Sequence, residues 1–127
     1  MRAFALPLLL AFAAGPALGQ TADPRELDTI SEIGRCLVQG LPEDWAAAHM
    51  VLELERPGAA SGNVRYLVAR KDVPERLESF TPCDTQAPAH ALVELRERQP
   101  EDRRGWTAAR LVIERDGSFR VSYDFPK

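Results

Sequence analysis

The sequence has few of the side chains that usually carry chemistry. It contains two histidines and two cysteines among 127 residues, and aromatic residues make up only 7% of the chain. No glycine-rich phosphate loop is present, and no serine stands in a nucleophile elbow. The cysteines and histidines lack the short spacings that are typical of zinc sites. These absences argue against a nucleotide-binding protein, a zinc protein and a serine hydrolase.

Positive charge is also scarce. Lys and Arg together number 16, against 19 Asp and Glu, which gives a formal net charge of −3, and the chain has no block of basic residues. Nucleic acids and anionic membrane surfaces attract proteins through such blocks. We therefore expect neither of them as a partner, and we expect no membrane insertion once the N-terminal segment has been removed.

Residues 1–19 have the three parts of a secretory signal peptide. Arg2 supplies a positive charge, an apolar run follows it, and small residues precede a cleavage point before Gln20. A membrane anchor is the alternative, but it needs about 20 apolar residues and Pro16 interrupts the run. We predict export to the periplasm or out of the cell, with residues 20–127 as one small domain.

Cys36 and Cys83 are the only cysteines of this predicted exported chain. An even number of cysteines in an oxidising compartment is typical of disulfides. Two buried thiols or a redox pair are alternatives, but redox cysteines are usually close together in sequence, and these are 83 − 36 = 47 positions apart. We predict a structural disulfide, which would stabilise the fold by about 4 kcal/mol for a loop of this length.

The residues that follow the signal peptide predict a helix and then two strands. Apolar residues recur at helical spacing over residues 27–41, after a helix start at Pro24. Trp45 stands at the next corner and is expected to close the end of the core. Alternation with a period of two then predicts strands over residues 46–55 and 64–69, joined by a turn rich in Gly and Ser.

The middle of the chain is less regular. Residues 71–86 contain two prolines and predict a connection, with a short edge strand or turn near its centre. Leu77 and Phe80 are expected to reach into the core. Thr85 is a candidate cap for a second helix that runs to about Arg98.

The last part of the chain predicts a β-hairpin. Two alternating runs rich in β-branched and aromatic residues lie on either side of Asp116-Gly117. A three-residue loop makes one face apolar throughout, and it requires Gly117 in the left-handed backbone region. The predicted pairs are Ile113 with Phe119, Leu111 with Val121, Ala109 with Tyr123 and Thr107 with Phe125.

The order of these elements predicts a fold class. Amphipathic strands with segregated helices are typical of an α+β domain. We predict a single domain with an antiparallel sheet of about four strands and two helices packed on one of its faces.

The histidines are weak candidates for a catalytic or metal site. His49 is predicted on the polar face of a strand, and Glu53 lies about 13 Å farther along that strand. His90 and Glu94 are one helical turn apart, which is an ordinary pair on a helix surface. We therefore predict no catalytic, cofactor-binding or metal-binding residues and no enzymatic activity.

Carboxylates are predicted to gather on the solvent face of the sheet. A pair of them could serve hydrolysis, but such residues more often keep an open sheet face hydrated. We expect this face to be acidic. The residues concerned are Glu53, Glu55, Glu114 and Asp124.

Two motifs carry a family resemblance. Leu41-Pro42-x-x-Trp45 follows the first helix, and Trp106 opens the last hairpin, whose second half reads Asp116-Gly117-Ser118-Phe119-Arg120-Val121-x-Tyr123-Asp124-Phe125. Through these motifs the chain from about residue 27 to residue 125 resembles the YezG-like immunity protein family. The resemblance implies an α+β protein that binds and neutralises a cognate toxin, without catalysis or a cofactor. The signal peptide, the two cysteines and residues 71–86 depart from the family pattern.

These observations leave two expectations for function. The first is an exported, periplasmic immunity or inhibitor-like protein that neutralises a toxin or hydrolase by direct binding, with an acidic sheet face or loops meeting a basic surface on the partner. The second is a small-ligand-binding or structural periplasmic domain, which needs a concave apolar pocket between the sheet and the helices.

Overall fold

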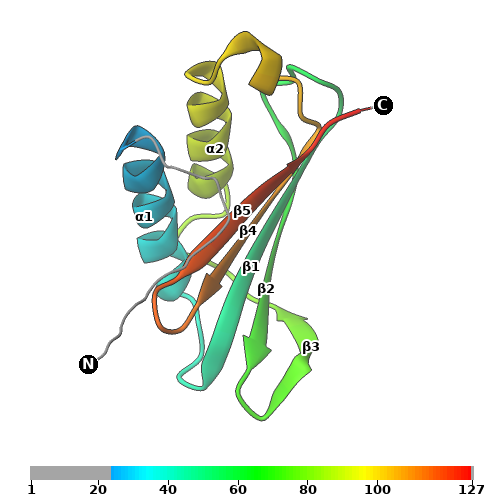
Figure 1. Cartoon of the computed structure of the whole chain (residues 1–127). Coiled ribbons are helices and arrows are strands. Elements are labelled where there is room, and N and C mark those ends of the chain that lie inside the picture. The colour runs from blue at the N-terminus through cyan, green and yellow to red at the C-terminus, as the bar shows by residue number, and fades with distance from the viewer. Residues whose placement is uncertain (1–23, 127) are drawn as a thin grey trace, which may run out of the picture.

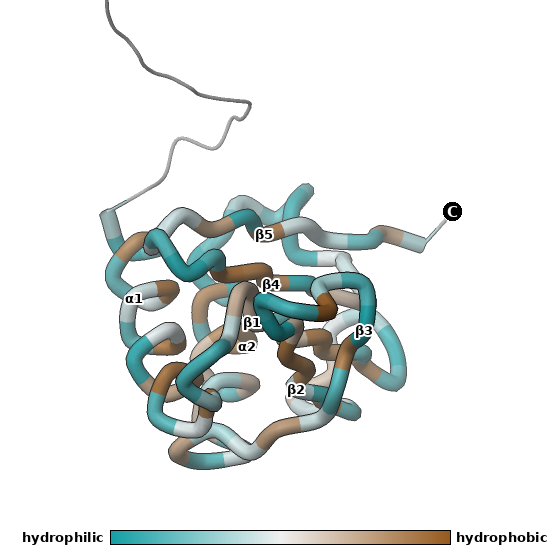
Figure 2. The backbone as a smooth tube through the Cα atoms, turned by 90° about the horizontal axis from the view of Figure 1, so that it is seen from below, coloured by the Kyte–Doolittle hydropathy of each residue, from teal (hydrophilic) through white to brown (hydrophobic). Residues whose placement is uncertain are grey.

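The computed structural model describes residues 24–126, so the predicted signal peptide and its cleavage point lie outside the described part. Two helices lie on the same side of one five-stranded antiparallel sheet (Figures 1 and 2). The strands are arranged in the order β3-β2-β1-β4-β5. The elements are α1 (Pro24–Val38), β1 (Trp45–Leu54), β2 (Gly62–Arg70), β3 (Val73–Ser79), α2 (Ala87–Glu97), the 3₁₀ helix η2 (Glu101–Arg103), β4 (Ala108–Glu114) and β5 (Phe119–Asp124).

The predicted α+β class is confirmed, with one strand more than expected. The extra strand is β3, which pairs with β2 at one edge of the sheet. The sequence offered a short edge strand or a turn in this segment, and the structure shows the strand, although its sequence, VPERLES, alternates poorly. The prediction that Leu77 enters the core is wrong, because Leu77 is 46% exposed. Phe80, which follows β3, does pack against the core as predicted.

The core lies between the sheet and the two helices. The first helix presents Ile30, Ile33 and Leu37 to it, as the helical spacing predicted. Alternate residues of the strands face these side chains, since successive strand residues point to opposite faces. The strand residues of the buried cluster are Met50, Leu52, Leu54, Tyr66, Ala109, Leu111 and Ile113.

Thr85 does not cap the second helix: the N-cap residue is Gln86, and the side chain of Asp84 accepts hydrogen bonds at the start of the helix. Its Oδ1 atom accepts hydrogen bonds from the backbone N–H groups of Gln86 and Ala87, at 2.8 and 2.9 Å. These bonds lower the pKa of the Asp84 carboxyl, because they stabilise its charged form. The predicted inward residues of this helix, Leu92 and Leu95, are buried.

The predicted disulfide is present. Cys36 on α1 is bonded to Cys83, which lies in the loop before α2. The backbone N–H of Cys83 also donates a hydrogen bond to the carbonyl of Cys36, at 2.9 Å. The disulfide therefore fixes the end of α1 to the segment that leads into α2.

The hairpin has the predicted register. Ile113 pairs with Phe119, Leu111 with Val121 and Ala109 with Tyr123. The three-residue loop closes through a 2.9 Å bond from the Gly117 N–H to the Glu114 carbonyl, and Gly117 has a φ of +95°. Asp116 Oδ1 accepts bonds from both the N–H and the hydroxyl of Ser118.

The predicted burial of the last strand holds only in part. Val121 and Tyr123 pack against the core, whereas Phe119 is 37% exposed. Phe119 lies on the outermost strand of the sheet, so no further strand covers its outer side. Trp45 is half-buried at the start of β1, where the guanidinium of Arg115 lies over its ring at 5.5 Å.

One charged residue lies inside the core. Arg96 of α2 is 3% exposed, and its guanidinium donates to the carbonyls of Ala59 and Gly58 at 2.8 and 3.3 Å. It also lies 5.7 Å from the ring centre of the fully buried Trp106 and forms an ion pair with Glu97. Arg96 therefore joins α2 to the loop between β1 and β2.

The turn at Gly117 supplies a first test. Gly117→Val should lower the free energy of unfolding by about 2 kcal/mol, because a β-branched residue is strained at positive φ. No atom lies within 4 Å of an added Cβ, so the effect comes from the backbone alone. Gly117→Asn should lower the free energy of unfolding clearly less, since Asn tolerates positive φ better than Val does. Urea denaturation measures the free energy of unfolding of both variants. Equal losses would contradict the positive φ of Gly117 in this turn.

The buried arginine supplies a second test. Arg96→Met should lower the free energy of unfolding by about 2 to 4 kcal/mol, because the carbonyls of Gly58 and Ala59 lose a charged donor. Arg98→Met, at the exposed residue that follows the same helix, is the matched control and should change stability by less than about 0.5 kcal/mol. Equal effects in urea denaturation would show that Arg96 does not hold the loop.

Candidate functional site: the open face of the sheet

The face of the sheet that points away from the helices is the candidate site. Alternation along each strand and the register between strands place its residues in rows. One row runs from Leu67 on β2 through His49 on β1 and Val112 on β4 to Arg120 on β5. No helix within residues 24–126 lies on this side (Figure 1).

Apolar residues form the middle of this face. Leu67 and Val112 are half-buried on either side of His49. In the next row, Val51 is only 5% exposed although no helix covers it. Its cross-strand neighbours are Arg65 and Arg110, and the aliphatic part of an arginine commonly lies along apolar surface in this way.

The expectation that this face is acidic is wrong. Arg65, Arg110 and Arg120 occupy its central rows, and Glu114 and the Glu53 row stand at opposite ends. Glu55 lies beyond the end of β1, where it pairs with Arg56. The sequence places positive and negative side chains on the polar sides of its strands. Only the register between the strands shows that the arginines meet in the middle of the open face.

Two of these arginines have no carboxylate partner within residues 24–126. Arg65 and Arg110 are exposed and form no ion pair there, whereas Arg120 lies 4.0 Å from Glu114. Even in this pair, 77% of the Arg120 side chain stays exposed. The face therefore presents an apolar centre among cations that remain accessible to a partner.

His49 lies at the centre of the face and next to the apolar residues. Partial burial lowers its pKa below the ordinary 6.5, and Arg120 and Arg110 lower it further, while Glu114 acts in the opposite direction. The neutral imidazole is therefore favoured near neutral pH. His49 lies on a sheet face, and Glu53 is two rows away from it, so the two do not form an acid–base pair.

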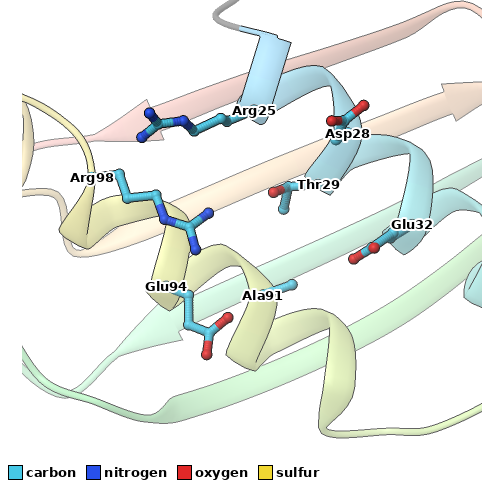
Figure 3. Close-up of a pocket in the computed structure, with 7 residues that line it drawn as sticks. All are labelled: Arg25, Asp28, Thr29, Glu32, Ala91, Glu94 and Arg98. Atoms are coloured by element: carbon cyan, nitrogen blue, oxygen red, sulfur yellow. The ribbon is translucent and has the colours of Figure 1, made fainter.

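His90 and Glu94 do not assemble a site either. Both are exposed on α2. Glu94 lines a groove of about 270 Å³ between α1 and α2 (Figure 3). The groove is lined mostly by charged and polar side chains on the outer sides of the two helices: Arg25, Asp28, Thr29, Glu32, Ala91, Glu94 and Arg98. It lies apart from the core, and it is not the apolar pocket that a small-ligand site between sheet and helices requires.

Residues 24–126 contain neither a cluster of metal-ligating side chains nor a helix that could span a membrane. In this part of the chain no group of three or more His, Cys, Asp or Glu side chains is placed to hold a metal ion. None of its helices is long and apolar enough to cross a membrane.

Comparisons with known proteins add no assignment. The chain matches no model of a known protein family, and no curated protein sequence matches it. The resemblance to YezG-like immunity proteins therefore rests on the motifs quoted above.

The environment of His49 gives a test by pH. The folded pKa is below the unfolded value of about 6.5, so the unfolded chain takes up the proton first as the pH falls. The stabilisation by neutral His49 is thus complete above pH 6.5 and is lost as the pH falls below that value. Denaturation midpoints at pH 7.5 and 5.5 should differ less for His49→Gln than for the wild type. An equal difference for the two proteins would contradict this account.

Proposed function

We propose that the mature chain is an exported, periplasmic binding protein of the immunity or inhibitor type. It neutralises a toxin or hydrolase by direct binding and performs no catalysis of its own. The YezG-like motifs favour this class of function. The observation that carries the proposal is the open face of the sheet, because a fold by itself defines no function.

The composition of the open face supports binding to another protein. Protein interfaces commonly have an apolar centre within a polar rim, and arginine is enriched in them. Leu67, Val51 and Val112 form such a centre, and Arg65 and Arg110 stand beside it. Because the rim carries both signs of charge, complementary charges would mainly fix the orientation of the partner.

The small-ligand alternative receives less support. It requires an apolar cleft between the sheet and the helices, but Trp106, Leu37, Met50 and Leu52 fill that space and are fully buried. The groove between α1 and α2 has mostly charged walls. We therefore favour a protein partner.

A photo-crosslinking experiment tests the proposal. Benzoylphenylalanine is placed at Val112 on the open face or at Glu32 on the outer side of α1, and the cells of origin are irradiated. We expect the Val112 probe, and not the Glu32 probe, to capture one envelope protein. That protein should be a toxin or hydrolase whose activity falls when an equimolar amount of the purified chain is added.

A substitution on the open face provides the quantitative control. Leu67→Asp combined with Val112→Asp should weaken binding to the captured protein at least tenfold, because charges are depleted from interface centres. Glu32→Gln should leave the affinity unchanged. A captured protein whose activity is not inhibited, or equal capture by both probes, would refute the proposal.

A further inference from the structure

Most of the exposed large apolar side chains gather at one edge of the molecule. Within residues 24–126 five such side chains are at least 37% exposed. Leu77 is on the open face, and the other four belong to α1, to β5 or to the residue after β5. These four are Leu27, Val38, Phe119 and Phe125, which are 41%, 48%, 37% and 47% exposed.

The helical positions place Leu27 and Val38 on the side of α1 that faces the outer edge of β5. At 100° per residue, Leu27, Gly34 and Val38 share one side of the helix. The residues that line the groove with α2 lie on another side. An added Cβ at Gly34 would meet Ile113, which pairs with Phe119, and the Tyr123 hydroxyl contacts Glu26 at 3.5 Å. Val38 therefore lies near the Phe119 end of β5, and Leu27 near the Tyr123 end.

The outer edge of β5 offers unpaired backbone groups. Antiparallel pairing directs the backbone of every second residue toward the neighbouring strand. The 2.8 Å bond from the Glu114 N–H to the Ser118 carbonyl sets this alternation, so Arg120 and Ser122 bond to β4. Phe119, Val121 and Tyr123 then direct their N–H and C=O groups away from the sheet.

The two edges of the sheet are protected to different degrees. The other edge strand, β3, contains Pro74 and several charged side chains, and its register shifts where Arg70 pairs with Val73. These are features with which proteins block pairing at an edge. The strand β5 has no proline and a regular register over its whole length. It is the edge that is able to accept another strand.

The sequence of this edge is complementary to itself. Residues 119–125 read Phe-Arg-Val-Ser-Tyr-Asp-Phe, which is symmetric about Ser122 in its apolar positions and opposite in its charges. When two copies pair antiparallel about Ser122, Phe119 lies opposite Phe125, Val121 opposite Tyr123 and Arg120 opposite Asp124. A two-fold axis produces each of these pairs twice.

We propose that two copies of this protein associate through β5 into a continuous ten-stranded sheet. In this dimer the outward N–H and C=O groups of Val121 and Tyr123 bond to the other copy. The exposed rings of Phe119 and Phe125 meet across the two-fold axis, beside Leu27 and Val38. Opposite charges directly across two strands stabilise their pairing, which fixes the register on the open face.

A charge-exchange series tests the register. Size-exclusion chromatography with light scattering should give twice the mass of one chain for the purified, disulfide-bonded protein. Arg120→Asp alone and Asp124→Arg alone should each raise the dissociation constant about tenfold or more, because each places like charges opposite each other at two symmetric positions. The double variant should restore dimerisation. A monomeric wild type, or single variants with the affinity of the wild type, would overturn the proposal.

A cysteine at the two-fold axis gives an independent measurement. Ser122 of one copy lies directly opposite Ser122 of the other, in a pair without backbone hydrogen bonds, where side chains approach most closely. Ser122→Cys should therefore form a disulfide-linked dimer on mild oxidation, since both native cysteines are already bonded to each other. Ser79→Cys, an exposed residue at the end of the other edge strand, should stay monomeric on a denaturing gel. Equal crosslinking of both variants would show only random collision and would overturn the proposal.

The fate of the dimer is independent of the proposed function. A dimer that inhibits no toxin or hydrolase would leave the pairing through β5 intact and refute only the inhibitor role. A monomer that inhibits its captured partner would refute only the dimer.

Discussion

The burial of Trp106 is the constraint on which the rest of the fold depends. Its ring has no exposed surface, lies 5.3 Å from the ring of Tyr123 on β5, and is covered by the guanidinium of Arg96 on α2. Its indole N–H donates to Gln99, just after α2, at 3.4 Å. An aromatic side chain of this size buries more area than any other residue can. The single side chain of Trp106 thus brings together the second helix, the outer strand and, through Arg96, the loop after β1.

The sequence alone was sufficient to predict those elements whose residue pattern lies within one short segment. The α1 stripe, the Asp116-Gly117 turn and the register of Ile113 with Phe119 all follow from spacing within a short segment. The strand β3 could be predicted only as one of two alternatives, a short edge strand or a turn, because its residues alternate poorly and its pairing with β2 supplies the missing information. The helix start was mispredicted for a similar reason, since Asp84 and Thr85 both have side chains suited to capping and only the backbone path decides which of them reaches the N–H groups of Gln86 and Ala87.

The open face shows why a candidate site is harder to predict than a fold. Arg65 and Arg110 are 45 positions apart in sequence, yet both are cross-strand neighbours of Val51. Their meeting depends on β1 lying between β2 and β4, which requires a chain crossing that alternation cannot reveal. The sequence shows which charged residues lie on the polar side of each strand. It does not show which charges become neighbours across the strands. The expected acidic surface is therefore an apolar centre flanked by arginines.

The proline of β3 has a consequence for the size of any assembly. A sheet that is open at both edges can add molecules without limit, and the product is a fibre. Here Pro74 lacks an N–H group, and the irregular pairing of Arg70 with Val73 further distorts that edge. Association through the opposite edge uses the same surface on both molecules and leaves none for a third. A dimer paired through β5 would therefore have no open edge at which a filament could grow.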